Sequence, residues 1–92
     1  MTAPGSGPAA LERLATALGP AFITTLVTGA GRPPHLSVIS RDTRAGEDVY
    51  ADESGWFWWP WAERIAATSD PLTAAHQVTA MLRGSIPVGG QR

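Results

Sequence analysis

Apolar residues near the amino end of the chain recur at helical spacing. Leu11, Leu14 and Leu18 fall at positions i, i+3 and i+7, so they share one face of a helix. The Gly-Pro pair at positions 19–20 is a typical stop signal. The pattern therefore predicts a helix over residues 8–18.

The middle of the chain has the pattern of β-strands. Residues 21–29 are rich in aromatic and β-branched side chains, and residues 35–41 and 48–52 alternate apolar and polar positions. A fourth strand is predicted to begin at Trp56 and to end at Pro60, because proline cannot donate to a sheet ladder. The connections are short, so we expect the strands to be antiparallel.

Helical spacing returns near the carboxyl end. Asp70 suits the N-cap of a helix and Pro71 its first position, which predicts a helix over residues 71–83. The positions predicted to share its buried face are Leu72, Ala75, Val78, Thr79 and Leu82. Residues 29–34, "GAGRPP", are predicted to form a loop, and residues 62–70 to lead from the sheet into this helix.

Together these elements predict a single α+β domain over residues 8–84. Its sheet is antiparallel, with three or four strands, and an N-terminal and a C-terminal helix pack on one face because each has a narrow apolar stripe to bury. A chain of 92 residues is one domain at most. Residues 1–7 and 85–92 are predicted to be flexible tails.

Composition and charge exclude several classes of function. The net charge of −1 gives no general attraction to nucleic acid, and no apolar run approaches the roughly 18 residues needed to cross a bilayer. The amino end has no basic flank and no apolar core, unlike a secretory signal. We therefore expect a cytoplasmic protein that binds neither nucleic acid nor membrane.

No residue pattern points to catalysis or to a cofactor. The chain has no cysteine, which excludes a disulfide framework and a thiolate metal site. Its two histidines, His35 and His76, are not part of a ligand-spaced cluster, so no metal site is predicted. The serines lack the sequence context of a nucleophile. No catalytic residue and no cofactor is predicted.

All four tryptophans lie in one segment, "GWFWWPW", at positions 55–61. In a strand, Trp56 and Trp58 point to one face, and Phe57 and Trp59 to the other. Two helices can cover one face of a small sheet. The second face would then expose an apolar patch of several hundred Å², roughly the surface of two or three aromatic side chains.

Three interpretations of these rings stay open. They could wrap the ends of a small core, form the interface of a homodimer, or line a platform for a small ligand. We favour a non-enzymatic interaction or regulatory accessory module, homodimeric through the aromatic face; the alternative is a small-molecule-binding protein or enzyme with His35, Glu63 or Arg64 as polar groups. The predicted contact residues are Trp56, Trp58, Trp59 and Trp61, then Tyr50 and Ile39, with a polar rim of Arg41, Glu63 and Arg64.

The segment "DVYADESGWFWWPWAERIA" and the later "DPLTAAHQV" resemble a group of short actinobacterial proteins of unknown function with a Trp-rich GWFWWxW segment. The likeness covers roughly residues 20–83, and the tryptophan segment is its specific part. Some members of the group look like companions of helix-turn-helix regulators. The resemblance implies a small α+β accessory protein and transfers no catalytic residue to this chain.

Overall fold

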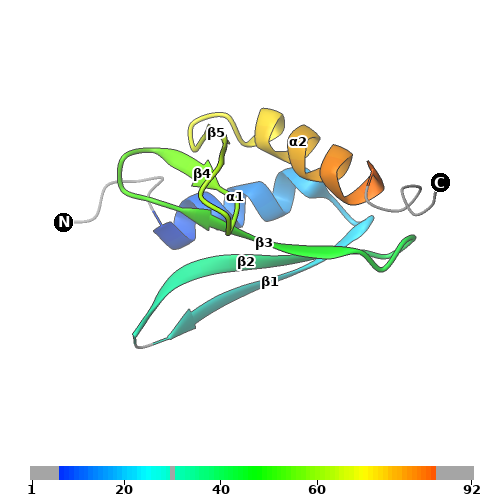
Figure 1. The fold of residues 1–92 in the computed structure, drawn as a ribbon, viewed down its shortest axis with the longest axis horizontal. Helices are drawn as coiled ribbons and strands as arrows, with labels where there is room; N and C mark the ends of the chain where they lie inside the picture. Colours follow the sequence, from blue (N-terminus) through cyan, green and yellow to red (C-terminus); the bar gives the residue numbers. More distant parts are fainter. Residues whose placement is uncertain (1–6, 30, 85–92) are drawn as a thin grey trace.

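The structure, a computed structural model, describes residues 7–29 and 31–84. The elements run in the order α1 (Gly7–Leu18), β1 (Phe22–Gly29), β2 (Arg32–Ser40), β3 (Gly46–Ala51), β4 (Trp56–Trp58), β5 (Arg64–Ala67) and α2 (Pro71–Gly84) (Figure 1). The predicted tails lie outside the described residues, except that Gly7 already belongs to α1.

The five strands form one antiparallel sheet in sequence order, β1-β2-β3-β4-β5. Each strand follows its neighbour through a short connection, so every pairing is a hairpin pairing. Both helices lie on the same side of the sheet (Figure 1). The predicted α+β class, with two helices on one face of an antiparallel sheet, is confirmed.

The sheet has one strand more than predicted, because Pro60 turns the chain and does not end the sheet. Trp59 donates its backbone N–H to the Glu63 carbonyl at 2.8 Å, and Ala62 donates to the Trp59 carbonyl at 3.0 Å. These bonds close a three-residue hairpin loop, and β5 returns along β4. The segment predicted to lead out of the sheet therefore includes an edge strand.

A second correction concerns the start of β2. The strand begins at Arg32 and includes Pro33 and Pro34, which the sequence placed in a loop. Neither proline has a paired partner on β1, since the register shifts between Val27 and Gly29. The prolines lie in an irregular stretch where no ladder donor is needed.

The core lies between the sheet and the two helices. Its largest fully buried side chains are Leu11, Leu14, Leu36, Val38, Val49, Phe57 and Val78. Helix α1 crosses β1, β2 and β3, whereas α2 packs against α1 and β5. The predicted strand faces hold for Leu36, Val38 and Val49, which point into this core.

Helix α2 begins as predicted but buries a slightly different face. The Asp70 carboxylate accepts the Thr73 N–H at 3.2 Å and the Thr73 hydroxyl at 2.7 Å, which confirms the predicted cap. These bonds from the Thr73 side chain and backbone lower the pKa of Asp70. Leu72 was predicted to be buried, yet it is 66% exposed. Ala75, Val78 and Leu82 are buried as predicted, and Ala74 is buried with them.

The β4–β5 hairpin offers a test of backbone strain. Ala62 has a φ of 67°, in the left-handed region that costs an L-residue roughly 1–2 kcal/mol. We expect Ala62→Gly to raise the free energy of unfolding by about 0.5 kcal/mol, after the entropy cost of glycine is subtracted. Urea unfolding would measure this change in the free energy of unfolding. Ala67→Gly within β5 is the matched control, and it should lower the free energy of unfolding by roughly 0.5–1 kcal/mol. An equal loss in both variants would contradict the strained turn.

Candidate functional site

The face of the sheet opposite the helices is covered by no segment within the described parts of the chain. We call it the open face. One row of paired residues crosses all five strands on this face, namely Val27, His35, Tyr50, Trp58 and Arg64. The His35 and Tyr50 rings in this row are 5.1 Å apart between centroids. The pairing therefore builds a row of aromatic side chains that ends at the exposed Arg64; within this row His35 is buried, at 8% exposed, and Tyr50 and Trp58 are half-buried.

The four tryptophans divide between the core and the surface. Phe57 is fully buried and Trp59 is 6% exposed, so both belong to the core. Trp56 and Trp58 are half-buried on the open face, and Trp61 is 48% exposed at the hairpin tip. Trp59 was among the predicted contact residues, but its burial leaves it inaccessible to a partner.

The exposed Trp61 covers part of the buried Trp59. Their rings are stacked, with centroids 5.2 Å apart and planes 8° from parallel. The Trp61 indole N–H donates to the Glu63 carboxylate at 2.8 Å. Glu63 therefore positions Trp61 over the core, and it does not extend the polar rim of the open face.

Arg64 lies over both tryptophans of the open face. Its guanidinium carbon is 4.6 Å from the centre of the Trp56 ring and 5.6 Å from that of Trp58. Both distances are within the range of a cation–π interaction, which contributes about 0.5–1 kcal/mol at an exposed site. In the part of the chain that the structure describes, no carboxylate forms an ion pair with Arg64. The two rings are thus the main partners of this cation.

Asp52, at the end of β3, organises the turn that leads into the tryptophan strand. One oxygen of its carboxylate accepts the Ser54 N–H at 3.0 Å, the Ser54 hydroxyl at 2.7 Å and the Trp56 N–H at 3.1 Å. The other oxygen accepts the indole N–H of Trp58. This carboxylate therefore fixes both the backbone of β4 and the orientation of one ring of the open face.

The charge of Asp52 is stabilised by these bonds. Partial burial of the carboxyl raises the pKa of Asp52, but hydrogen bonds from Ser54, Trp56 and Trp58 outweigh it, so the net pKa lies below the ordinary value of 3.8. The site residues predicted from the sequence do not include Asp52. The signal that could have identified it is the run Asp-x-Ser-Gly at positions 52–55, which is typical of an Asx-type turn. Gly55 completes that turn at a φ of 98°.

The other end of the open face is aliphatic. Ile23 and Ile39 are paired across β1 and β2, and they are 44% and 38% exposed. Gly46 pairs with Ile39 on β3, where an added Cβ would lie 3.1 Å from the Ile39 side chain. Arg41 lies beyond this end and donates its Nε to the Pro20 carbonyl at 2.9 Å, so it is far from the tryptophans along the strand.

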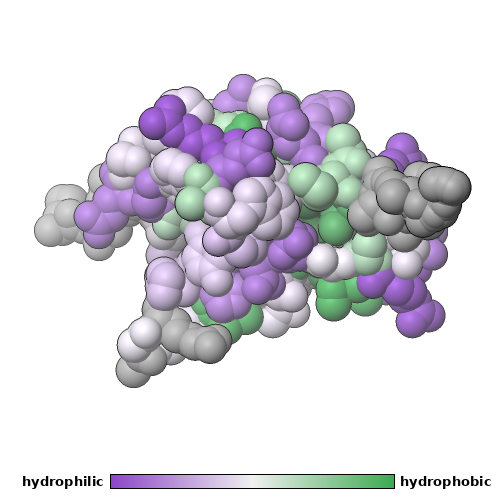
Figure 2. Space-filling view, viewed as in Figure 1, coloured by the Kyte–Doolittle hydropathy of each residue, from purple (hydrophilic) through white to green (hydrophobic). Residues whose placement is uncertain are grey.

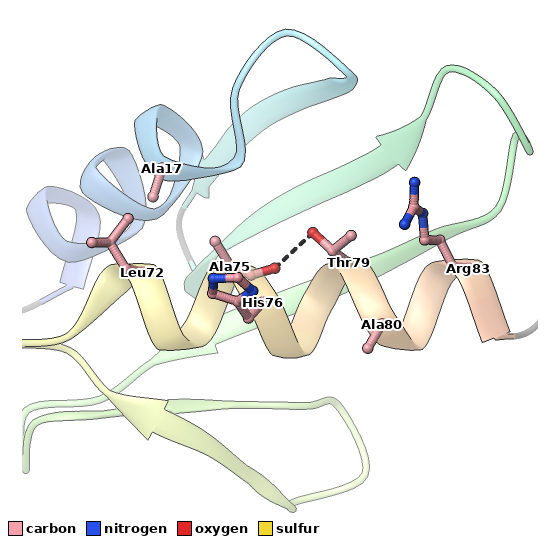
Figure 3. A pocket seen from close by; sticks show the side chains of 7 residues that line it. All are labelled: Ala17, Leu72, Ala75, His76, Thr79, Ala80 and Arg83. Carbon is pink, nitrogen blue, oxygen red and sulfur yellow. Dashed lines mark hydrogen bonds between the residues drawn. The ribbon is translucent and has the colours of Figure 1, made fainter.

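Neither of two surface hollows brings the predicted polar groups together. One, of about 330 Å³, is lined by Pro33, His35, Asp48 and Tyr50. The other, of about 460 Å³, lies between the helices, with Ala17 of α1 facing α2 (Figure 3). In Figure 2 green residues show mainly beside and below the second half of α2, whereas pale and purple residues cover β4 and β5.

No protein-family model matches the sequence, and no curated protein or solved structure is significantly similar to it. The resemblance to the Trp-rich actinobacterial group stays a prediction. Among the described residues, no helix is long and apolar enough to cross a membrane, and no group of three or more histidine or acidic side chains is placed to hold a metal ion. The open face is therefore assessed on its own geometry.

Proposed function

We propose that this protein is a non-enzymatic interaction module that associates through its open face, most simply with a second copy of itself. The observation that carries the proposal is the group of half-buried aromatic rings of Tyr50, Trp56 and Trp58 on the open face, next to the more deeply buried His35. Aromatic side chains are common anchors of protein interfaces. An apolar group of this kind on a small domain is typical of an interaction surface.

The distribution of charge supports a second copy as the partner. The open face carries an acid, Asp48, and a base, Arg64, on different strands. A two-fold axis brings each part of a face against another part of the same face, so opposite charges can meet. The aliphatic pair Ile23 and Ile39 adds apolar area at the far end. The net charge of −1 gives little repulsion between copies.

The ligand-binding alternative has less support. It would be favoured by a pocket in which the tryptophans meet polar groups such as His35, Glu63 or Arg64. His35 and Arg64 are separated by two intervening strands in their row, and Glu63 is bonded to Trp61 at the hairpin tip. The hollow beside His35 is near the lower end of the roughly 300–1,000 Å³ that small-molecule pockets occupy.

We expect light scattering on a size-exclusion column to give a mass near twice 9.7 kDa that falls on dilution. Ile39→Asp should weaken this dimer at least tenfold, because it buries an unpaired charge in the interface. Leu72→Asp is the matched control: Leu72 is even more exposed, but it lies on α2, away from the open face.

The two variants also separate the possible outcomes. If Leu72→Asp weakened the dimer and Ile39→Asp did not, association would involve the helices and the proposed interface would be wrong. A constant monomer at every concentration would overturn self-association through this face.

A further inference from the structure

The contact between Arg64 and the two open-face tryptophans shows which chemistry these rings accept. We propose that Trp56 and Trp58 form a receptor for a guanidinium group, supplied by an arginine side chain of a partner polypeptide, and that Arg64 is an internal occupant which the partner displaces. This inference rests on the proposed interaction function, because it names the group that the open face recognises.

The rings suit a guanidinium better than an ammonium group. A guanidinium is planar, delocalised and weakly hydrated, so it stacks on aromatic faces at a small desolvation cost, whereas an ammonium is compact and strongly hydrated. The indole N–H of Trp58 donates to the Asp52 carboxylate, which fixes the ring and places a negative charge beside it. Tyr50 is paired with Trp58 across the strands and extends the aromatic surface.

Arg64 is held loosely enough to leave. It is exposed, it lies at the start of the edge strand β5, and its side chain contacts two ring faces at 4.6 and 5.6 Å. A contact of this kind is weak when water can reach it. Arg41 differs, since its Nε donates to the Pro20 carbonyl at 2.9 Å, in a contact remote from the rings. Arg41 is therefore the matched control for Arg64.

The competition between Arg64 and an added cation can be measured on the full chain, at a concentration where light scattering shows the monomer, so that no second copy covers the open face. N-ethylguanidinium chloride would be titrated while the four indole N–H resonances are followed by NMR, with sodium chloride at equal ionic strength as the blank. We expect the resonances of Trp56 and Trp58 to shift and those of Trp59 and Trp61 to stay. Ethylammonium chloride should bind more weakly.

Removal of the internal occupant should strengthen binding. Arg64→Ala is expected to bind N-ethylguanidinium about 2- to 5-fold more tightly than the unaltered chain, the factor that corresponds to a lost cation–π competitor. Arg41→Ala should leave the affinity unchanged. Arg64→Gln, which keeps most of the stem, should behave like Arg64→Ala and guards against a local packing effect. Equal affinities in all four proteins, or equal shifts of all four indoles, would overturn the receptor.

The source of the guanidinium is tested with a blocked Gly-Arg-Gly peptide. Tighter binding of this peptide than of N-ethylguanidinium would support a polypeptide arginine. Equal binding would overturn that part and leave a site for free guanidinium compounds. Failure here is distinguishable from failure of the proposed dimer, because these titrations follow indole resonances whereas the dimer test follows mass.

Discussion

Replacing Trp59 with alanine is expected to lower the free energy of unfolding by about 3–5 kcal/mol, the usual cost of deleting a buried aromatic side chain. Trp59 is 6% exposed and belongs to the same core cluster as Phe57 and Val78. A domain of this size has a total stability of roughly 5–15 kcal/mol, so the loss is a large share of it. Urea unfolding followed by far-UV circular dichroism would measure the change.

Trp61→Ala is the matched control, because Trp61 stacks directly on Trp59 from the solvent side. It is 48% exposed, so its removal should cost only about 0.5–1.5 kcal/mol of ring stacking. The variant should remain folded at room temperature. Similar losses in the two variants would mean that Trp59 is not the core member of the pair.

Strand alternation was enough to sort the tryptophan segment into two faces. The sequence placed Trp56 and Trp58 together, opposite Phe57 and Trp59, and the burial of these four side chains follows that division. It could not say which pair faces the core, because all four positions are aromatic. Only the placement of α1 and α2 on one side of the sheet decides that question.

The fifth strand was missed for a related reason. β5 has four residues, Arg64–Ala67, which is too short to show alternation, and it follows a proline that is typical of a strand end. The hairpin that creates β5 also moves Arg64 across from Trp58. The cation over the rings could therefore not be predicted, although Arg64 itself had been named as a rim residue.

Replacing Asp52 with alanine is expected to lower the free energy of unfolding by about 2 kcal/mol. Its carboxylate accepts hydrogen bonds from Ser54, Trp56 and Trp58. Hydrogen bonds to charged groups contribute roughly 1.5–3 kcal/mol each when buried, and the total is reduced here because the group is partly open to solvent. Ser54→Ala removes only the hydroxyl bond and should cost less than about 1 kcal/mol. A loss in Asp52→Ala no larger than in Ser54→Ala would contradict the role of Asp52 as the organiser of the turn.

The same carboxylate predicts how stability depends on pH. The pKa of Asp52 in the folded chain lies below its ordinary value of 3.8, so on acidification the unfolded chain takes up the proton first. The contribution is complete above about pH 5 and is lost as the pH falls through the lower, folded pKa. We therefore expect the stability difference between the unaltered chain and Asp52→Asn to be largest near neutral pH and to shrink as the pH falls below 3.8. The pKa of Asp70 is also lowered, so Asp70→Asn is the control. The part of the acid-induced loss of stability that comes from Asp70 should persist in Asp52→Asn. A difference that stayed constant from neutral to strongly acidic pH would mean that the charge of Asp52 does not stabilise the turn.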